Sequence, residues 1–337
     1  MQEARSSGEW NARVRALGGS FPQSWEWGEF RRRLGWRPLR LYDPEAGAAA
    51  QVLLRELPAG LGYFGYVPYG PVAATAGGVC KAASLVGEAA RERGVVLLKV
   101  EPRIPESDIP GLEGFFRSPE TVQPRITMLV DILEDPEEQL RRLPKDTRYG
   151  IRRSKREGVE LAVSTGPGEE LEDFLQLLEQ TSDRQRFAIR PRSYYRDFMR
   201  DLPAYLILAR HEGRAVAGAI IVIFGEEAYY LFGASIPDRQ NLYAPYLVQW
   251  ENMNVARRAG AVRYDMWGGV PGDPEDRSHP LWGVYQFKKK FGGRIEKFAG
   301  AYDRDLARLR GRLARTGLRG YAALRRLRAR NALPPAD

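Results

Sequence analysis

The order of apolar and polar positions predicts helices and strands that alternate along the first part of the chain. An aromatic-rich segment over 23–36 has helical spacing, and a second helix is expected over 79–93. The segment 60–72 is dense in glycine and tyrosine and contains two prolines, so we expect an irregular surface loop there. Apolar runs and alternating patterns predict four strands, over 39–43, 48–57, 94–102 and 124–132.

The remainder of the chain repeats this mixed order after a break at Asp135 and Pro136, where we place a domain boundary. Helices are expected over 136–158, 169–181 and 193–200, with a basic loop over 183–192. Strands are expected over 159–164, 204–213 and 214–235, the last with a hairpin turn at Gly225. The repetition indicates duplication of one architecture, and the expected fold class is mixed α/β with central strands.

A strand, a basic loop and a helix follow one another near 235–246, which is the layout of GNAT-type acyltransferases. In those proteins a helix N-terminus and the loop before it bind a pyrophosphate, usually with the pattern Arg/Gln-x-x-Gly-x-Gly/Ala. This chain has Arg239, Leu242 and Ala244 at the first, fourth and sixth places. Leucine replaces the glycine whose missing Cβ lets backbone N–H groups approach the phosphates. We therefore expect a GNAT fold whose acyl donor is not acyl-CoA.

The composition excludes several classes of protein. Cys80 is the single cysteine, and the two histidines are His211 and His279, so we expect neither an internal disulfide framework nor a Cys/His zinc site. No apolar run reaches the roughly 20 residues that span a bilayer, and the N-terminus lacks the hydrophobic core of a signal peptide. These features predict a cytoplasmic protein.

Most of the net charge of +9 lies at the C-terminal end, where residues 303–337 contain ten arginines and three aspartates. Such a basic amphipathic helix docks on anionic lipid, here over 303–330 at the inner face of the membrane, or on a nucleic-acid backbone. The alternative is a terminal helix packed on its own domain with a solvated arginine face. Gly311, Gly317 and Gly320 weaken it as one continuous helix. Apolar residues recur between the arginines at helical spacing: Leu306, Leu309, Leu313, Tyr321, Leu324 and Leu327.

Two stretches carry a family resemblance: "YYLFGASIPDRQNLYAPYLVQWENMNVARRAGAVRYDMWGG" and "GVYQFKKKFGGRIEKFAGAYD". Together with "RYGIRRSKREGVELAV" they resemble the Fem-type (FemABX) peptidoglycan aminoacyltransferases, densely over 143–302 and more loosely before that. The resemblance implies two GNAT-like domains, 1–135 with 303–337, and 136–302. It also implies transfer of an amino acid from aminoacyl-tRNA to an amino group of a stem peptide in a UDP-linked or lipid-linked muropeptide.

The resemblance implies a role for the lysine cluster, which is unusual in a chain whose basic residues are mostly arginine. Aminolysis of an aminoacyl ester passes through a tetrahedral intermediate with an anionic oxygen, which a cation in a low-dielectric groove stabilises. The family assigns this role to the lysine at the position of Lys288, with Phe287 beside it contacting substrate. Lys289 and Lys290 are expected to point elsewhere, toward the tRNA backbone or solvent.

Further positions match the family's contacts with the precursor. Arg190 and Tyr194 fall where an arginine and a tyrosine contact its diphosphate, and a guanidinium binds phosphate oxygens bidentately. Glu101 falls at a carboxylate suggested to take a proton from the attacking amine, and a strand-end carboxylate without function is the alternative. The family's Tyr-x-Tyr is Tyr230-Leu-Phe232 here, so the second ring stacks but donates no hydrogen bond.

Tyr243 also matches the family, whereas Asp265, Gly268 and Gly269 are interpreted first as turn and packing residues. Two other functions remain open at this point. One is an acyl-CoA-dependent GNAT N-acyltransferase acting on an envelope sugar or peptide, and the other is a non-catalytic protein that uses the basic tail on membrane or RNA. No cofactor or metal is expected. The transferred amino acid and the choice between a nucleotide-linked and a lipid-linked acceptor are left open.

Overall fold

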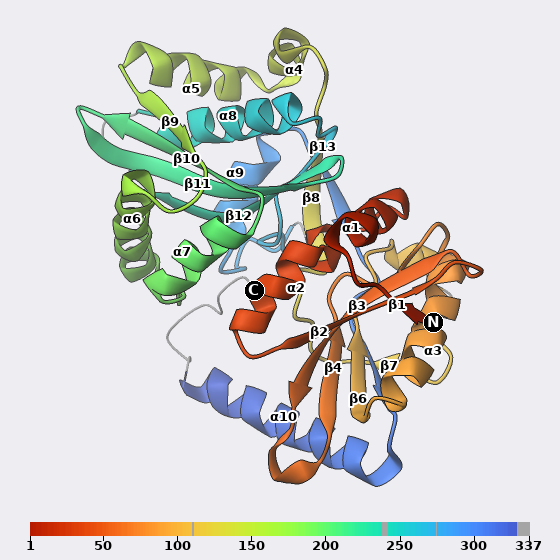
Figure 1. Ribbon diagram of the computed structural model, residues 1–337. Helices are drawn as coiled ribbons and strands as arrows, with labels where there is room; N and C mark the ends of the chain where they lie inside the picture. Colours follow the sequence, from red (N-terminus) through yellow and green to blue (C-terminus); the bar gives the residue numbers. More distant parts are fainter. Residues whose placement is uncertain (110, 238–241, 274, 329–337) are drawn as a thin grey trace. The chain divides into compact units, whose positions relative to one another are not determined.

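The computed structural model describes residues 1–109, 111–237, 242–273 and 275–328 (Figure 1). The chain forms two compact units. Unit 1 combines Met1–Arg125 with the segment that begins at Lys297, and unit 2 is Ile126–Glu296. The C-terminal segment therefore returns to the first unit.

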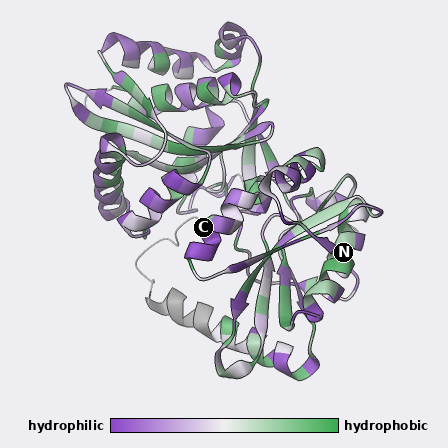
Figure 2. Cartoon of the chain, viewed as in Figure 1, coloured by the Kyte–Doolittle hydropathy of each residue, from purple (hydrophilic) through white to green (hydrophobic). Residues whose placement is uncertain are grey.

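Unit 1 is built on a mostly antiparallel sheet with the order β1-β2-β3-β4-β6-β15-β7, with β5 paired to β3. Apolar side chains such as Val52 and Leu98 are fully buried in it, and Figure 2 shows its central strands as largely hydrophobic. Its strands are β1 (Gln2–Glu3), β2 (Arg37–Asp43), β3 (Ala48–Glu56), β4 (Tyr63–Val67), β5 (Val72–Ala73), β6 (Val95–Val100), β7 (Phe116–Arg117) and β15 (Tyr302–Asp305).

Helices cover both faces of this sheet. Val52 of β3 belongs to one apolar cluster with Ala83 and Val86 of α3. The adjacent Gln51 points the other way, and its side chain donates to the carbonyl oxygens of Pro22 and Ser24, beside α2. The helices are α1 (Ser7–Ala16), α2 (Trp25–Arg33), α3 (Ala76–Arg91) and α10 (Arg308–Arg328), with short 3₁₀ helices η1 (Phe21–Gln23), η2 (Pro58–Gly60) and η3 (Glu106–Asp108).

Unit 2 has a sheet with the order β14-β8-β13-β12-β11-β10-β9. Its strands are β8 (Ile126–Asp131), β9 (Glu160–Ser164), β10 (Ala204–His211), β11 (Arg214–Phe224), β12 (Glu227–Ser235), β13 (Arg263–Asp265) and β14 (Arg294–Lys297). Its helices are α4 (Pro136–Arg142), α5 (Lys145–Arg156), α6 (Glu169–Gln185), α7 (Arg192–Asp201), α8 (Ala244–Arg258) and α9 (Trp282–Lys289).

The long strand β11 of unit 2 lies between two helical layers. Ile221 joins an apolar cluster with Leu247 and Met253 of α8. Residues of the opposite parity face α6, where Gly218 leaves room for Phe174, because an added Cβ would lie only 2.7 Å from its ring. Helix α5 packs on α8 and forms an outer layer of this unit (Figure 1).

Each sheet contains a parallel pair of strands joined through a helix. In unit 1 the pair is β4 and β6, with α3 between them in sequence. In unit 2 it is β12 and β13, with α8 between them. A parallel neighbour requires a crossover connection, so both units share one arrangement, as the repeated element order predicted. The mixed α/β class and the repetition of one architecture are confirmed.

Two details differ from the predictions. The units divide at Arg125 and Glu296, not at 135 and 302, because β8 forms a ladder with β13 of the second sheet. The segment 60–72 was expected to be an irregular loop, but it contains β4, which pairs with β3 on one side and β6 on the other. Gly65 fits in this strand because it lies under Leu98 and Val52, where a Cβ would be crowded.

The basic C-terminal segment forms one helix, α10, despite its glycines. Gly311 allows the helix to approach β6 closely, since a Cβ there would lie 2.7 Å from the Val96 carbonyl oxygen. Ala314 is buried beside it, whereas Leu309 and Leu313 are exposed. Where its side chains are described, the helix therefore packs through Gly311, Ala314 and Leu318, and not through Leu309 and Leu313 of the predicted stripe.

Two of the three glycines of α10, Gly311 and Gly317, should respond oppositely to substitution. Gly311→Ala should lower the free energy of unfolding by about 1–3 kcal/mol, because the new methyl group meets the Val96 carbonyl oxygen. Gly317→Ala meets no atom within 4 Å and should raise it by roughly 0.5–1 kcal/mol through helix propensity. Thermal unfolding of both variants measures the difference, and equal shifts would contradict the packing of α10 on β6.

Candidate functional site

Lys288 lies in the last turn of α9, and only 5% of it is exposed. Its ammonium donates to the carbonyl oxygens of Met266 and Gly268, both at 2.5 Å. The ammonium also lies 5.5 Å from the centre of the Tyr230 ring. Among the described residues, no carboxylate forms an ion pair with it. The prediction that Lys288 differs from its neighbours is consistent with this burial, since Lys289 is exposed.

A turn after β13 directs the two carbonyl groups at Lys288. The fully buried Asp265 accepts from the Trp267 N–H at 2.7 Å, and Trp267 takes a left-handed backbone conformation with φ of 61°. Thr127 of β8 donates to the same carboxylate and lies 2.9 Å from the Trp267 carbonyl oxygen. Asp265 is therefore a turn residue, as expected. Thr127 was not predicted, because its role depends on the pairing of β8 with β13.

The environment of Lys288 changes its ionisation. Burial lowers the pKa of Lys288 to about 8, and the negative charge of Asp265 partly opposes this shift. Two of its three N–H groups are held by the protein, so the ammonium is fixed in direction. A buried cation of this kind, without a paired carboxylate, can stabilise an anionic oxygen that forms next to it.

Tyr230 lies beside the Lys288 ammonium and forms a hydrogen bond with the buried side chain of Gln249. The β12 strand has a bulge at Leu231, because Ile221 pairs with Tyr230 and Ile220 pairs with Phe232. Burial raises the pKa of Tyr230 to about 12, and a hydrogen bond with Gln249 opposes that rise. The phenol is therefore neutral near pH 7, and its ring face lies toward the lysine.

The predicted residues Arg190, Tyr194 and Phe232 come together in one aromatic cluster. Phe232 meets the rings of Tyr195 and Phe198 edge-on, with centroids 5.1 and 5.3 Å apart, and that of Tyr194 at 6.5 Å. The Arg190 guanidinium lies 5.7 Å from the centre of the Tyr194 ring. Phe232 thus packs within this cluster, and its contact with substrate stays a prediction.

Phe287 and Tyr243 both contact the ring of Tyr246. Tyr246 was not among the predicted site residues. The Tyr246 ring is 5.4 Å from Phe287 and 5.8 Å from Tyr243. Tyr243 takes a left-handed conformation, with φ of 53°, just before α8 begins. Lys290 donates to the Tyr246 hydroxyl at 3.0 Å and pairs with Asp146 at 3.3 Å. In the sequence, the signal that could have identified Tyr246 was its position three residues after Tyr243.

Glu101 belongs to unit 1, whereas Lys288 belongs to unit 2. Its carboxylate is 2% exposed and accepts from the Tyr66 hydroxyl at 2.5 Å, the Val122 N–H at 2.6 Å and the Gln123 N–H at 3.0 Å. Burial raises its pKa, and these hydrogen bonds oppose the rise. These hydrogen bonds tie residues 122–123 to the end of β6, and the role of Glu101 as a base stays a prediction.

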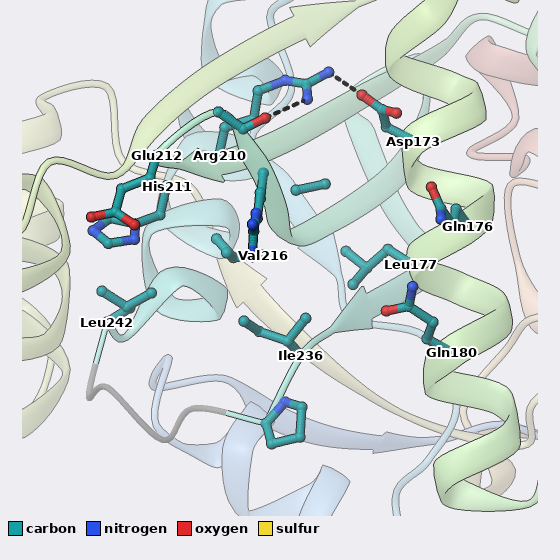
Figure 3. Close-up of a pocket in the computed structure, with 14 residues that line it drawn as sticks. Asp173, Gln176, Leu177, Gln180, Arg210, His211, Glu212, Val216, Ile236 and Leu242 are labelled. Carbon is teal, nitrogen blue, oxygen red and sulfur yellow. Dashed lines mark hydrogen bonds and ion pairs between the residues drawn. The ribbon is translucent and has the colours of Figure 1, made fainter.

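A cavity of about 690 Å³ lies at the end of the unit 2 sheet (Figure 3). It is lined by α6, by the turn between β10 and β11, and by Leu242, which is buried. Asp173 and Arg210 form an ion pair across its rim. Arg239, the first residue of the expected GNAT phosphate pattern, lies outside the described residues. None of the predicted catalytic or binding residues lines this cavity.

Two kinds of site are not found in the described part of the chain. No helix there is both long and apolar enough to cross a membrane. No group of three or more histidine, cysteine, aspartate or glutamate side chains there could hold a metal ion.

Comparison with solved structures defines the class of fold. The chain resembles FemX with a TM-score of 0.78 and 20% identity, over 90% of this chain and 97% of that one. It also resembles a tandem GNAT protein from the clavulanic acid biosynthesis pathway, with a TM-score of 0.51 and 14% identity, over 90% and 98% of the two chains. The fold is therefore that of tandem GNAT-like proteins.

A model of the FemAB family matches residues 111–212 and 204–316, so the chain belongs to the FemAB family. The lipid II:glycine glycyltransferase of Staphylococcus haemolyticus is 23% identical over 254 residues, which cover 55% of this chain and 60% of that protein. The Staphylococcus aureus protein of the same name is 35% identical over 107 residues, 32% of this chain and 25% of that protein. The chain thus spans less than two thirds of the length of these relatives.

The lowered pKa of Lys288 predicts a pH-dependent stability. Between pH 8 and 10.5 the unfolded lysine binds more protons than the folded one, so stability should rise with pH in this window. Relative to Lys288→Met, the wild type should gain about 3 kcal/mol across it. Urea unfolding at several pH values measures this gain, with the exposed Lys289→Met as the control. If the free energy of unfolding changed equally with pH in wild type and in Lys288→Met, the burial of the ammonium would be contradicted.

Proposed function

We propose that this chain transfers an amino acid from an aminoacyl-tRNA to an amino group on the stem peptide of a lipid-linked cell-wall precursor. The observation that carries the proposal is the buried ammonium of Lys288, which the protein holds with carbonyl groups and without a paired carboxylate. Membership of the FemAB family supports the class of reaction. The printed names of the relatives, lipid II:glycine glycyltransferases, support a lipid-linked acceptor.

In the proposed reaction, the acceptor amine attacks the carbonyl carbon of the aminoacyl ester and forms a C–N bond. The carbonyl oxygen becomes anionic, and the third N–H of Lys288 donates to it. The intermediate then breaks the C–O bond to the ribose. The ribose oxygen takes up a proton as it leaves, and the attacking nitrogen loses one, so an amide and a free ribose hydroxyl result.

The remaining predicted residues fit contacts with the two substrates. Phe287 and Tyr243 provide aromatic surface on the side of Lys290, and Tyr230 provides the ring face next to the ammonium. Arg190 and Tyr194 are proposed to contact the diphosphate of the precursor, since the guanidinium lies over the ring and both groups can approach one anion. Glu101 is proposed as an anchor of its own unit.

Replacing Lys288 should abolish most of the transfer. We expect Lys288→Ala to lower the rate about a hundredfold, the effect of removing one oxyanion donor. The wild-type rate should decline as the pH rises through about 8, because the ammonium then loses its proton. The measurement is transfer of radiolabelled amino acid from charged total tRNA to lipid-linked and UDP-linked muropeptides.

Lys289→Ala, which removes an exposed neighbouring lysine, is the matched control and should retain the wild-type rate. A folded protein that transfers nothing from charged tRNA but binds coenzyme A would overturn the proposal in favour of an acyl-CoA donor. Transfer to the UDP-linked muropeptide alone would retain the reaction and overturn the lipid-linked acceptor.

We also propose that α10 holds the protein at an anionic membrane surface. Leu309 is 73% exposed and Leu313 is 53% exposed, and the two are one turn apart on the side opposite the buried Gly311 and Ala314. Exposed arginines Arg308, Arg310 and Arg312 lie among them. These five exposed residues are the α10 face. Apolar side chains flanked by cations match the boundary between lipid headgroups and acyl chains.

The charge distribution of α10 is unfavourable for folding alone. Its first turn contains arginines and no acidic residue, although the partial positive charge at a helix N-terminus favours carboxylates there. An anionic surface would offset the repulsion between these arginines and the partial positive charge of the helix N-terminus. The helix contains eight arginines and no acidic residue over its whole length, so its charge suits a strongly anionic partner.

The α10 face predicts selective binding to anionic vesicles. Wild type should float with phosphatidylglycerol vesicles and not with phosphatidylcholine vesicles. Arg308→Gln/Arg310→Gln/Arg312→Gln should weaken binding about a hundredfold, at roughly 1 kcal/mol for each cation. Leu309→Ser/Leu313→Ser should also weaken it, whereas Val262→Ser, which changes an exposed valine in unit 2, should not. Equal flotation of all variants would overturn this assignment.

A further inference from the structure

Helix α5 presents a second basic surface, and the proposed chemistry at Lys288 does not account for it. The helix contains six basic side chains and one acidic side chain in 12 residues. Its buried side consists of Thr147, Gly150, Ile151 and Ser154. The opposite side carries exposed residues at helical spacing, which form the α5 face: Lys145, Tyr149, Arg152 and Arg156.

Tyr149 is an exposed aromatic ring held among cations. It is 46% exposed, and the Arg153 guanidinium donates to its hydroxyl at 2.9 Å. That hydrogen bond, and next the positive charges of Arg153 and Arg156, lower the pKa of Tyr149. Large aromatic side chains are usually buried, so an exposed ring within a basic face is a feature of binding surfaces.

The α5 face is joined to the region of Lys288 by direct contacts within unit 2. The Thr147 hydroxyl donates to the carbonyl oxygen of Lys290 at 2.9 Å, which ties the start of α5 to the end of α9. A row of neighbouring aromatic rings also connects the α5 face with the region of Lys288. Their centroids are 5.8 Å apart from Tyr149 to Tyr243, 5.8 Å from Tyr243 to Tyr246, and 5.4 Å from Tyr246 to Phe287. Phe287 directly precedes Lys288.

We propose that the α5 face binds the acceptor end of the RNA substrate, with its cations on phosphates and Tyr149 against a base. This inference rests on the proposed function, in which the donor is an aminoacyl-tRNA. Arginines and lysines neutralise phosphates, and aromatic rings stack on unpaired bases. The row of rings then leads from the surface toward Lys288, where the esterified end of the strand would react.

RNA fits this face better than lipid does. The α5 face has no exposed aliphatic side chain, whereas the α10 face has two exposed leucines. The distance from Lys145 to Arg156 along the helix is about 16 Å. A strand that advances roughly 3.4 Å per nucleotide covers about five nucleotides over that length. The two basic helices of this chain are therefore suited to different anions.

The test is binding of an RNA minihelix with an acceptor stem and a single-stranded 3′ end, measured over a series of salt concentrations. Lys145→Gln/Arg152→Gln/Arg156→Gln should weaken binding at least tenfold at about 0.1 M salt. It should also reduce the slope of log K against log salt by about 2. Tyr149→Ala should weaken binding roughly five- to 150-fold, the range for loss of one stacked base.

The charge-matched control is Arg308→Gln/Arg310→Gln/Arg312→Gln, which should leave minihelix binding within about twofold while removing vesicle binding. If both α5 variants bind the minihelix as tightly as wild type, the α5 face is not the RNA surface, even if transfer from tRNA occurs. If α5 variants lose vesicle binding and keep RNA binding, the face is a lipid surface. If wild type binds no RNA, the proposed donor fails as well.

Discussion

The hydrogen bonds from Lys288 to the carbonyl oxygens of Met266 and Gly268 determine how the candidate site of unit 2 is built. A buried ammonium is costly unless several acceptors surround it, so the turn after β13 must keep both carbonyl groups in place. Asp265 holds that turn through the Trp267 N–H, and its negative charge partly opposes the lowering of the Lys288 pKa by burial. The catalytic proposal and the stability change with pH both depend on this arrangement.

The two units use their polar groups differently although they share one architecture. In unit 1, Glu101 is saturated with donors from Tyr66, Val122 and Gln123, so its buried charge serves to connect segments of the fold. In unit 2, Lys288 keeps one N–H group that no described acceptor holds. The two units therefore differ in their buried charge: unit 2 contains a cation held by two carbonyl oxygens, and unit 1 contains a carboxylate held by three donors.

The two basic helices differ in the uncharged residues that lie among their exposed cations. α5 packs on α8 and exposes cations around a tyrosine, whereas α10 packs on β6 and exposes cations around leucines. Small residues determine which sides are free. Gly150 lies against Tyr243 and Tyr246, and Gly311 lies against the Val96 carbonyl oxygen, so each helix turns its larger side chains outward. Net charge alone does not distinguish the two surfaces, because the difference lies in the neutral residues among the cations.

The alternation of elements, the mixed α/β class, the family resemblance and the special position of Lys288 can be predicted from the amino-acid sequence, because they depend on local periodicity and short motifs. Features that depend on pairing across long sequence separations became visible only in the folded chain. β8 belongs to the second sheet because it pairs with β13, and the glycine-rich segment holding β4 is a strand because β3 and β6 flank it. The contacts of Thr127 and Tyr246 with the candidate site were not predicted for the same reason. Their partners lie far away in the chain, and no local pattern records a contact that forms only when distant segments pack together.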